Sequence, residues 1–429
     1  MSKDRIATSP ALLALSAAAA ALPGYSGPAQ AWADESVEAG YRYSHYQEAA
    51  LPASATNGGP GERYRVDSHQ FHWLQPQGEA WDFKTDLMLE TMSGASPWYV
   101  APGSGGQAIQ VLSGASIQDR RAVLQGRARQ HLEQGRRALS LGISKEDDYL
   151  AYSGGVEAEW DFNQRRNTLS AGLGYSYDQL KPTDGGSARF PDRIAKADKD
   201  SFTAYAGLSQ VLTPQTVAQL ALSYSYSDGY LSDPYKLAYV DARLLPDNRP
   251  QDRNQWALTG RLRHYLRSLQ AALHVDARYY TDSWGLASDS LEVAWVQKLP
   301  ADWRLTPSLR WYQQGHANFY RPYYTVARED GYYSSDYRLS AYGALSGRIA
   351  AEKSWRGFSF AAAVEAYESD GDLALRAVRD ESPGLVDFLV VSAAVSYQWS
   401  LAPPAPRGTS TLQPEPALPT PVQVIPVTP

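Results

Sequence analysis

The chain of 429 residues contains no cysteine. A disulfide framework, a thiolate metal site, a covalent haem attachment and a lipid-anchored N-terminal cysteine are therefore all excluded. Beyond the N-terminal segment, no apolar stretch approaches the roughly 20 residues that a membrane-spanning helix needs. The sequence also lacks a Lys/Arg-rich run and carries a formal net charge of −6, which argues against a nucleic-acid partner.

The aromatic composition is unusual, because 29 Tyr and 12 Trp accompany only 9 Phe and 3 Met. Tyr and Trp combine an apolar ring with a polar tip, and they suit surfaces where an apolar environment meets water. Length and composition together leave two classes of protein, a large soluble β protein and a membrane β-barrel.

The first 33 residues have the pattern of a secretory signal peptide. Lys3 and Arg5 precede an apolar run over 11–22, and an Ala-x-Ala pattern follows over 29–31. A charged start, a short apolar run and small residues before a cleavage site are typical of such signals. We expect residues 1–33 to be removed on export; the alternative is a buried N-terminal helix.

Most of the remaining chain alternates between apolar and polar residues. Between residues 81 and 92, Trp81, Phe83 and Leu87 occupy odd positions, whereas Asp82 and Glu90 occupy even ones. Side chains on a strand point to opposite faces in turn, so this segment has one apolar and one charged face. A soluble sandwich also alternates in this way, and the pattern alone does not separate it from a barrel.

The lengths of the connections do separate the two. We expect strands near 36–47, 63–74, 81–92, 120–133, 136–146, 149–162, 167–178, 201–212, 216–227, 254–266, 270–282, 289–299, 304–314, 335–347, 357–368 and 387–399. These are about 16 strands close to the 9–11 residues that cross a bilayer when tilted. Short connections alternate with long ones, with exceptions near 147–148 and 283–288. This sorting predicts an all-β, antiparallel up-and-down transmembrane β-barrel over residues 34–400, with long extracellular loops and short periplasmic turns.

Aromatic residues support the barrel. Pairs such as Tyr175 and Tyr177 stand near strand ends that adjoin long connections, while Trp73, Trp81 and Trp303 stand near short ones. Two aromatic belts are typical of the two membrane interfaces of a barrel.

The last segment, 401–429, contains nine prolines in the stretch from Leu401 to Pro429. Proline cannot donate to a strand ladder, so we expect a flexible periplasmic tail, partly in polyproline II. It is either a spacer or a docking strip for a periplasmic protein.

Several segments resemble a known bacterial family. They are SGASIQDRR (113–121), GYLSDPYKL (229–237), DRNQWAL (252–258), DGYYSSDYRLSAYGALS (330–346) and SPGL (382–385). Together they resemble the family catalogued as domain of unknown function 3570. The resemblance implies an exported outer-membrane β-barrel and no established reaction. It also implies a redox or metal-handling setting, because relatives sit beside a thioredoxin-like protein, a small lipoprotein and a flavin-attaching enzyme. The proline-rich tail departs from the usual pattern, in which the last strand closes the chain.

If the apolar face meets lipid, charged residues line the inside. The candidates are Asp82, Asp86, Glu90, Arg121, Arg127, Arg129, Arg261, Arg263, Asp276, Arg278, Arg310 and Arg338. Antiparallel pairing is expected to set Glu90 near Arg121, Asp86 near Arg127, Asp82 near Arg129 and Arg261 near Asp276. Such pairs either stabilise the inner wall or form a charged constriction that orients a polar solute.

Three expected strands, 136–146, 149–162 and 167–178, have mainly Gly, Ser and Ala at their inward positions. Glycine and serine permit close approach of another backbone. We therefore expect loop 93–119 or loop 228–253 to pack against this strip.

Sites for chemistry are weakly indicated. The seven histidines are scattered, and His69 and His72 fall on opposite faces of one strand. Asp228, Asp233, Asp241, Asp247 and Asp252 share one long loop, but their spacing matches no Ca²⁺-binding motif. We expect no enzyme, no cofactor and no metal centre.

The sequence thus favours an outer-membrane channel for small polar solutes or ions. The alternative is a non-catalytic sleeve or anchor for a periplasmic or surface partner, such as a redox or metal-handling lipoprotein. The expected partners are the lipid bilayer with its lipopolysaccharide, the barrel assembly machinery and a periplasmic protein bound through 401–429.

Overall fold

The computed structural model describes residues 36–56, 61–113, 117–188 and 190–400. The expected signal peptide and proline-rich tail lie outside the described residues.

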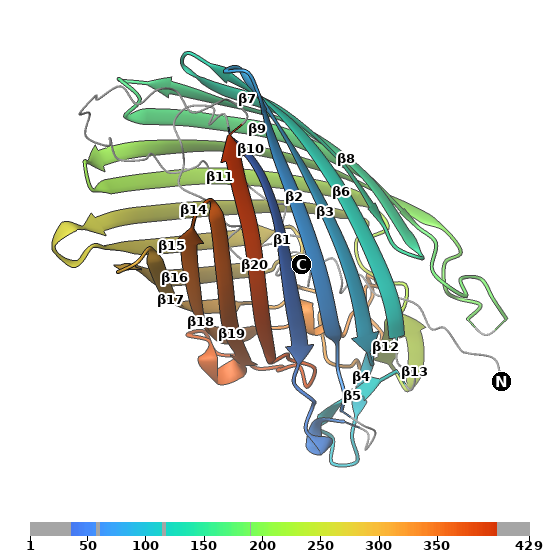
Figure 1. Ribbon diagram of the computed structural model, residues 1–429. Coiled ribbons are helices and arrows are strands. Elements are labelled where there is room, and N and C mark those ends of the chain that lie inside the picture. Colours follow the sequence, from blue (N-terminus) through green and yellow to red (C-terminus); the bar gives the residue numbers. More distant parts are fainter. Residues whose placement is uncertain (1–35, 57–60, 114–116, 189, 401–429) are drawn as a thin grey trace, which may run out of the picture.

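The described chain forms a closed antiparallel barrel of 16 strands, in which each strand pairs with its neighbours in sequence order (Figure 1). The barrel strands are β1 (Ser36–Glu48), β2 (Arg65–Gln77), β3 (Trp81–Gly94), β6 (Ile117–Leu132), β7 (Gly135–Lys145), β8 (Tyr149–Phe162), β9 (Asn167–Leu180), β10 (Ala197–Thr213), β11 (Thr216–Gly229), β14 (Asp252–Leu266), β15 (Ala271–Asp282), β16 (Ala287–Leu299), β17 (Trp303–Gln314), β18 (Tyr342–Trp355), β19 (Phe358–Asp370) and β20 (Phe388–Ser400). The barrel closes where β1 pairs with β20, from Ser36 opposite Ser400 to Glu48 opposite Phe388. The up-and-down barrel predicted from the sequence is therefore confirmed.

Fifteen of the strands lie close to their expected ranges, and one is displaced. A strand was expected over 335–347, whereas β18 begins at Tyr342 and a 3-10 helix, η3 (Tyr337–Leu339), stands before it. The alternation of apolar and polar residues through this segment imitates a strand. The carboxylate of Asp336, however, accepts a hydrogen bond from the backbone N–H of Arg338 and caps η3, so the segment turns before the barrel strand begins.

The connections fall into two groups, one at each end of the barrel. Short turns join β2–β3, β6–β7, β8–β9, β10–β11, β14–β15, β16–β17 and β18–β19. Three of them contain consecutive residues with positive φ, such as Ala301 and Asp302 at 56° and 58°. Two central residues with positive φ are the mark of the tight hairpin turns that match strand twist.

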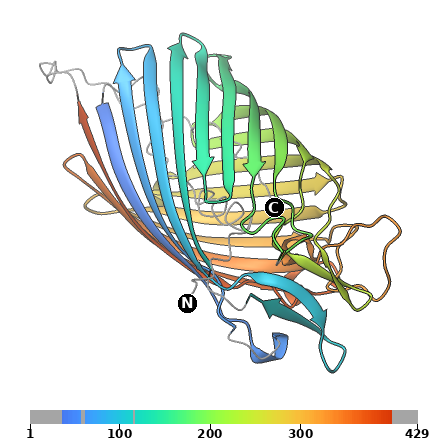
Figure 2. The ribbon, with the colours of Figure 1, turned by 90° about the vertical axis from the view of Figure 1, so that its right-hand side faces the viewer.

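The opposite end carries eight loops, which we name L1 (49–64), L2 (95–116), L3 (146–148), L4 (181–196), L5 (230–251), L6 (283–286), L7 (315–341) and L8 (371–387). L2 contains the hairpin β4 (Pro97–Pro102) and β5 (Ala108–Leu112), and L5 contains β12 (Leu237–Val240) and β13 (Arg243–Pro246). The short helices η1 (Ala53–Ala55), η3 and η4 (Gly371–Leu373) lie in L1, L7 and L8, whereas η2 (Arg267–Leu269) forms the β14–β15 turn. Both small hairpins lie at the same end of the barrel (Figures 1 and 2).

The outer face of the barrel is apolar. Leu220, Leu309 and Ile349 are exposed by 55%, 56% and 54% on strands whose alternate residues turn inward. Near the short turns, Trp73, Trp160 and Trp355 are also exposed, which agrees with the aromatic belt predicted for that end. An exposed apolar band with aromatic residues at its edge is the exterior of a transmembrane barrel. Within the described residues, no helix combines the length and apolarity needed to cross a membrane.

Candidate functional site

Two of the expected charge pairs lie on the neighbouring strands β3 and β6. The register places Glu90 opposite Arg121 and Asp82 opposite Arg129, as expected. Arg121 Nη1 is 3.8 Å from Glu90 Oε2, and Arg129 Nη1 is 3.7 Å from Asp82 Oδ2. His131 Nε2 lies 2.6 Å from the same oxygen of Asp82. Asp82 and Glu90 of β3 therefore each have a cationic partner on β6.

The expected pair between Asp86 and Arg127 does not form. Antiparallel register places Asp86 opposite Gln125 and sets Arg127 opposite Lys84. Lys84 Nζ instead lies 2.9 Å from Asp86 Oδ1 on the same strand. Arg127, with a like charge opposite, forms an ion pair with Glu157 on β8. These charges are still neutralised, but Asp86 pairs within β3 and Arg127 pairs with β8.

The expected contact between Arg261 and Asp276 is present, and Arg263 strengthens it. Arg261 lies opposite Asp276 in the register, with its Nε 3.7 Å from Asp276 Oδ1. Arg263 donates two hydrogen bonds to the two carboxylate oxygens of Asp276, at 2.7 and 2.8 Å. A two-point contact between a guanidinium and a carboxylate is directional and strong for an ion pair.

The last three candidates have different positions. Arg278 on β15 and Arg310 on β17 occupy inward positions, since their neighbours Tyr279 and Leu309 are exposed on the outer face. Arg338 was expected on a strand facing the barrel interior, but it lies in η3 within L7. The reason is the cap at Asp336, which ends the strand-like pattern before β18.

The strip of small residues is partly covered by side chains from neighbouring strands. Tyr205 on β10 lies over Gly172, where an added Cβ would stand 2.3 Å from a ring carbon. Arg121 on β6 donates a hydrogen bond to Ser144 at 3.0 Å. L2 and L5 were the alternatives expected to pack against the strip, and both contact other loops instead. Tyr235 of L5 donates to Asp148 in L3, and Lys236 of L5 donates to the carbonyl of Pro97 in L2.

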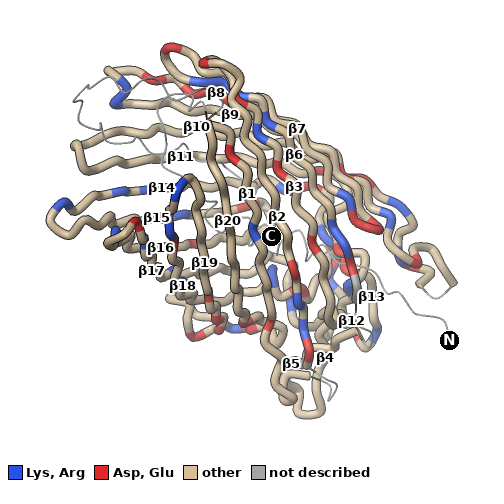
Figure 3. Tube along the Cα trace, viewed as in Figure 1, with Lys and Arg blue, Asp and Glu red and all other residues tan. Residues whose placement is uncertain are grey.

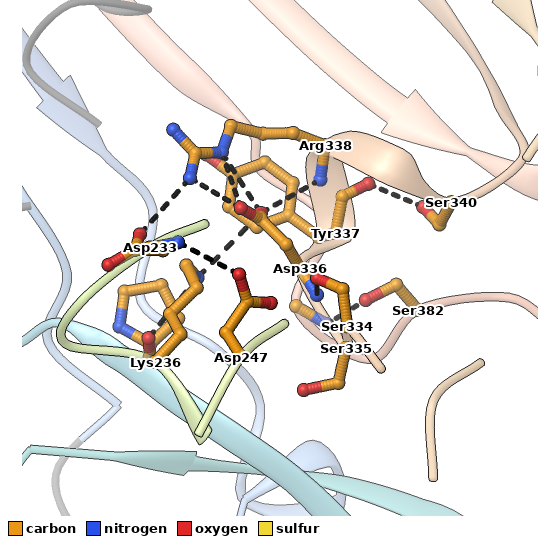
Figure 4. Close-up of polar contacts among 12 residues, drawn as sticks. Asp233, Lys236, Asp247, Ser334, Ser335, Asp336, Tyr337, Arg338, Ser340 and Ser382 are labelled. Carbon is orange, nitrogen blue, oxygen red and sulfur yellow. Dashed lines mark hydrogen bonds and ion pairs between the residues drawn. The ribbon is translucent and has the colours of Figure 1, made fainter. Parts of the chain in front are cut away.

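The loops meet in a buried group of charged side chains, which we call the cap network: Asp233, Lys236, Asp247 and Arg249 of L5, with Asp336 and Arg338 of L7. Figure 4 labels all of these residues except Arg249. Arg338 Nε donates to both carboxylate oxygens of Asp336 at 2.9 Å. Arg249 Nη2 donates to Asp336 at 2.9 Å, and Lys236 Nζ lies 3.7 Å from it. Asp336, whose exposed fraction is 0%, thus holds three cations together.

The other two carboxylates of the cap network complete its charge balance. Asp247 accepts hydrogen bonds from Arg249 Nε at 2.7 Å and from the backbone N–H of Asp233 at 2.8 Å. Arg338 Nη2 lies 3.4 Å from Asp233 Oδ2. Three carboxylates therefore balance three cations in a place where an unbalanced charge would be costly.

Burial and neighbouring charge act in opposite directions on the pKa values of two of these carboxyls. Burial alone would raise the pKa of Asp336, but Arg338, Lys236 and Arg249 outweigh it and hold that pKa well below its usual range. Burial raises the pKa of Asp247, and the nearby Asp233 adds to the effect while Arg249 opposes it. Asp336 is therefore the ionised centre of the cap network.

Further contacts join the cap network to the rest of the loop end. Lys236 Nζ donates to the carbonyl of Pro97 in L2 at 3.3 Å. Arg63 of L1, whose Nε lies 2.6 Å from Glu48 at the end of β1, donates to the carbonyl of Gly384 in L8 at 3.0 Å. The ring of Tyr337 has Arg63 on it at 5.3 Å and Lys236 at 5.8 Å from its centroid. Five of the loops, L1, L2, L5, L7 and L8, are thereby tied together.

A second group of acidic side chains surrounds Arg121 where β6 meets the loops. Glu146 of L3 places Oε1 3.6 Å from Arg121 Nε, and Glu90 approaches the same guanidinium. Burial, followed by the nearby charge of Asp119, raises the pKa of Glu146 well above its usual value. Glu146 therefore resists ionisation at the loop end of the barrel.

The residues considered for catalysis or metal binding do not converge. His69 contacts Tyr41 and His72 contacts Glu38, on opposite faces of β2, as expected from their spacing. Asp233 and Asp247 are engaged in the cap network. Across the described ranges, no cluster of three or more His, Cys, Asp or Glu residues is arranged to bind a metal ion.

The cap network could not be identified from the sequence, although several of its residues belong to segments described above. Asp233 and Lys236 belong to the segment GYLSDPYKL, and Asp336 and Arg338 belong to DGYYSSDYRLSAYGALS. From the sequence, Asp233 was considered only as part of an acidic loop and Arg338 only as a residue facing the barrel interior. Asp336 and Arg338 also fell within the expected strand 335–347, so nothing in the sequence indicated that they meet L5.

A family model with the description "Protein of unknown function (DUF3570)" matches residues 12–386. The chain belongs to this family. The resemblance seen in the loop segments is thereby confirmed, and it carries no known activity. No curated protein matches the chain.

Several solved structures have a similar barrel. A mutant of the ferric enterobactin receptor PfeA from Pseudomonas aeruginosa is 10% identical, with a TM-score of 0.42 over 77% of this chain and 53% of the receptor. The CymD monoaromatic hydrocarbon channel is 10% identical, with a TM-score of 0.40 over 86% of this chain and 89% of the channel. The outer membrane protein OpdK from Pseudomonas aeruginosa is 9% identical, with a TM-score of 0.38 over 85% and 98%. The chain spans about half the length of the receptor, and similarities this distant say nothing about what it carries or binds.

Proposed function

We propose that this family member is an outer-membrane channel that lets small polar solutes or ions pass down their gradient. The observation that supports it best is the contrast between the two faces of the barrel, apolar outside and charged inside. Residues of both charge signs follow the barrel strands (Figure 3). A solute that crosses such a barrel exchanges its hydration for polar side chains and never meets lipid. A channel of this kind performs no chemical reaction.

Reconstitution of the purified full chain tests the proposal. We expect discrete conductance steps in planar bilayers and swelling of liposomes in small sugars or salts. Arg127→Ala is expected to change the conductance, because it removes an inward cation and frees Glu157. Unchanged conductance with lower stability would assign this ion pair to the wall alone, and the absence of both conductance and swelling would refute the channel.

The interlocked loops favour a second candidate, a non-catalytic sleeve or anchor whose outer end stays closed until a partner binds. Its support is the buried cap network, because ion pairs with side chains 0–10% exposed fix the loops in one arrangement. For a sleeve we expect no swelling from the protein alone. Copurification with and without residues 401–429 then identifies whether a periplasmic partner docks on the tail.

A further inference from the structure

The inward charges form ion pairs on one side of the inner wall more often than on the other. On β3, β6, β7 and β8 most inward charges are paired, as in Arg136 with Glu159 at 2.6 Å. Four inward arginines on the other side are Arg278 on β15, Arg310 on β17, Arg348 on β18 and Arg42 on β1. Among the described residues, none of these four guanidiniums forms an ion pair or a hydrogen bond. We call these four residues the arginine arc.

The members of the arginine arc lie on one side of the curved inner wall. Arg348 lies opposite Ser308, which is the inward position next to Arg310. Inward residues related by this diagonal stand about 7–8 Å apart at their Cα atoms. Arg278 lies opposite Ser290, the inward position next to Glu292, and Glu292 lies opposite Arg310. Arg42 lies farther along the same wall, on β1 beyond β19 and β20. The four positive charges therefore lie along one side of the inner wall, from β15 across the barrel closure to β1.

Three carboxylates stand beside the arginine arc, and one of them, Glu352, is paired with Arg304 at 3.4 Å. The other two do not neutralise the arc. Glu292 lies opposite Arg310, and Glu365 lies opposite Arg348 in the register. In the part of the chain that the structure describes, neither carboxylate is within 4.0 Å of a cationic nitrogen. Four guanidiniums beside these two carboxylates leave the group with a surplus of positive charge. Since most charges on the opposite wall are paired, this surplus acts on a passing ion.

We propose that the arginine arc makes the channel selective for anions and binds small oxyanions, those bearing a carboxylate or a phosphate group. The inference rests on the proposed channel function and adds the class of solute. A guanidinium presents a planar fork of donors that matches the two oxygens of a carboxylate or phosphate. Guanidiniums already engaged with a protein carboxylate lack free donors in that geometry, whereas those of the arc retain them. Rings of charged side chains set the sign of ion that a pore admits.

Reversal potentials in planar bilayers under a KCl gradient test the selectivity. We expect the unmodified channel to favour chloride. Arg310→Gln with Arg348→Gln should shift the reversal potential toward potassium, and Glu292→Gln with Glu365→Gln should shift it further toward chloride. Lys353→Gln is the matched control, because Lys353 shares β18 with Arg348 but has its ammonium 5.8 Å from the Trp303 ring at the short-turn end. Potassium selectivity of the unmodified channel would overturn the proposal. Equal shifts of the reversal potential in the Arg310/Arg348 double variant and in Lys353→Gln would also overturn it.

A binding measurement separates this inference from the channel function itself. Inorganic phosphate and acetate are titrated into the detergent-solubilised full chain and followed by calorimetry. Binding that is lost in the Arg310/Arg348 variant and kept in Lys353→Gln supports the arginine arc even if no current flows, in which case the channel alone fails. Conductance without oxyanion binding, or binding that survives loss of both arginines, removes the arc as an oxyanion site.

Discussion

Asp336→Asn is expected to loosen the loop end while leaving the barrel intact. The substitution keeps the size of the side chain and removes one charge from the centre of the cap network. Lys236, Arg249 and Arg338 would then face only the carboxylates of Asp233 and Asp247, which leaves one buried positive charge unbalanced. Removing one partner of a buried ion pair costs about 3–5 kcal/mol.

This cost has a measurable consequence at the contact between L5 and L7. Asn248 and Tyr333 exchange two backbone hydrogen bonds there, at 2.9 and 2.8 Å, and their amides become exchangeable only when the loops separate. At about 1.4 kcal/mol for each tenfold change, a cost of about 3–5 kcal/mol raises the open population by roughly two to three and a half powers of ten. Hydrogen–deuterium exchange of the folded protein in detergent measures this acceleration directly.

Asp330→Asn provides the control in the same loop. Asp330 pairs with Arg328, and both side chains are substantially exposed, at 42% and 30%. An exposed pair contributes about 0–1 kcal/mol, so exchange at Asn248 and Tyr333 should accelerate only a few-fold. Lys236→Met added to Asp336→Asn removes the surplus cation and should recover part of the loss. Equal acceleration in Asp336→Asn and Asp330→Asn would refute the idea that buried charge balance holds the loops together.

Three further outcomes follow from the same structure. Leu309→Arg, on the lipid face of β17, should cost about 2–4 kcal/mol in membrane folding, whereas Ser308→Arg, on the inner face beside it, should insert normally. Folding into liposomes is measured as the heat-modifiable band on gels, and equal folding of the two variants would contradict the orientation of the strand. Because the pKa of Glu146 is raised in the folded protein, its contribution to stability is present below the ordinary glutamate pKa of 4.5 and declines as pH rises from there toward the raised value. The protection factors of L3 amides, which divide out the intrinsic base-catalysed exchange rate, should therefore fall with rising pH in the unmodified protein and much less in Glu146→Gln. Ala301→Gly should stabilise the barrel by about 1 kcal/mol, since Ala301 has a φ of 56° and an L-residue with a side chain is strained there; an unchanged urea midpoint would show that the turn carries no such strain.

The sequence by itself determined the barrel. Lipid outside and polar groups inside impose a period of two on every spanning strand, and this period is visible one strand at a time, as at Trp81–Glu90. The same period gave the strand limits, and from these limits followed the alternation of short and long connections and the pairing of Asp82 with Arg129. The error at 335–347 was also local, because a capped turn at Asp336 continues the alternation of a strand without pairing as one.

Only the tertiary structure decided how charges far apart in the chain combine. Asp233 and Asp336 share Arg338 because L5 and L7 meet at one end of the barrel, and loop contacts have no sequence period from which they could be predicted. Likewise, Arg42 lies on the same wall as Arg348 only because β1 closes on β20 and brings the two ends of the barrel sequence together. Alternation is a property of neighbouring residues and is written in the chain, whereas electrostatic partnership depends on distance in space and arises only when the barrel has closed.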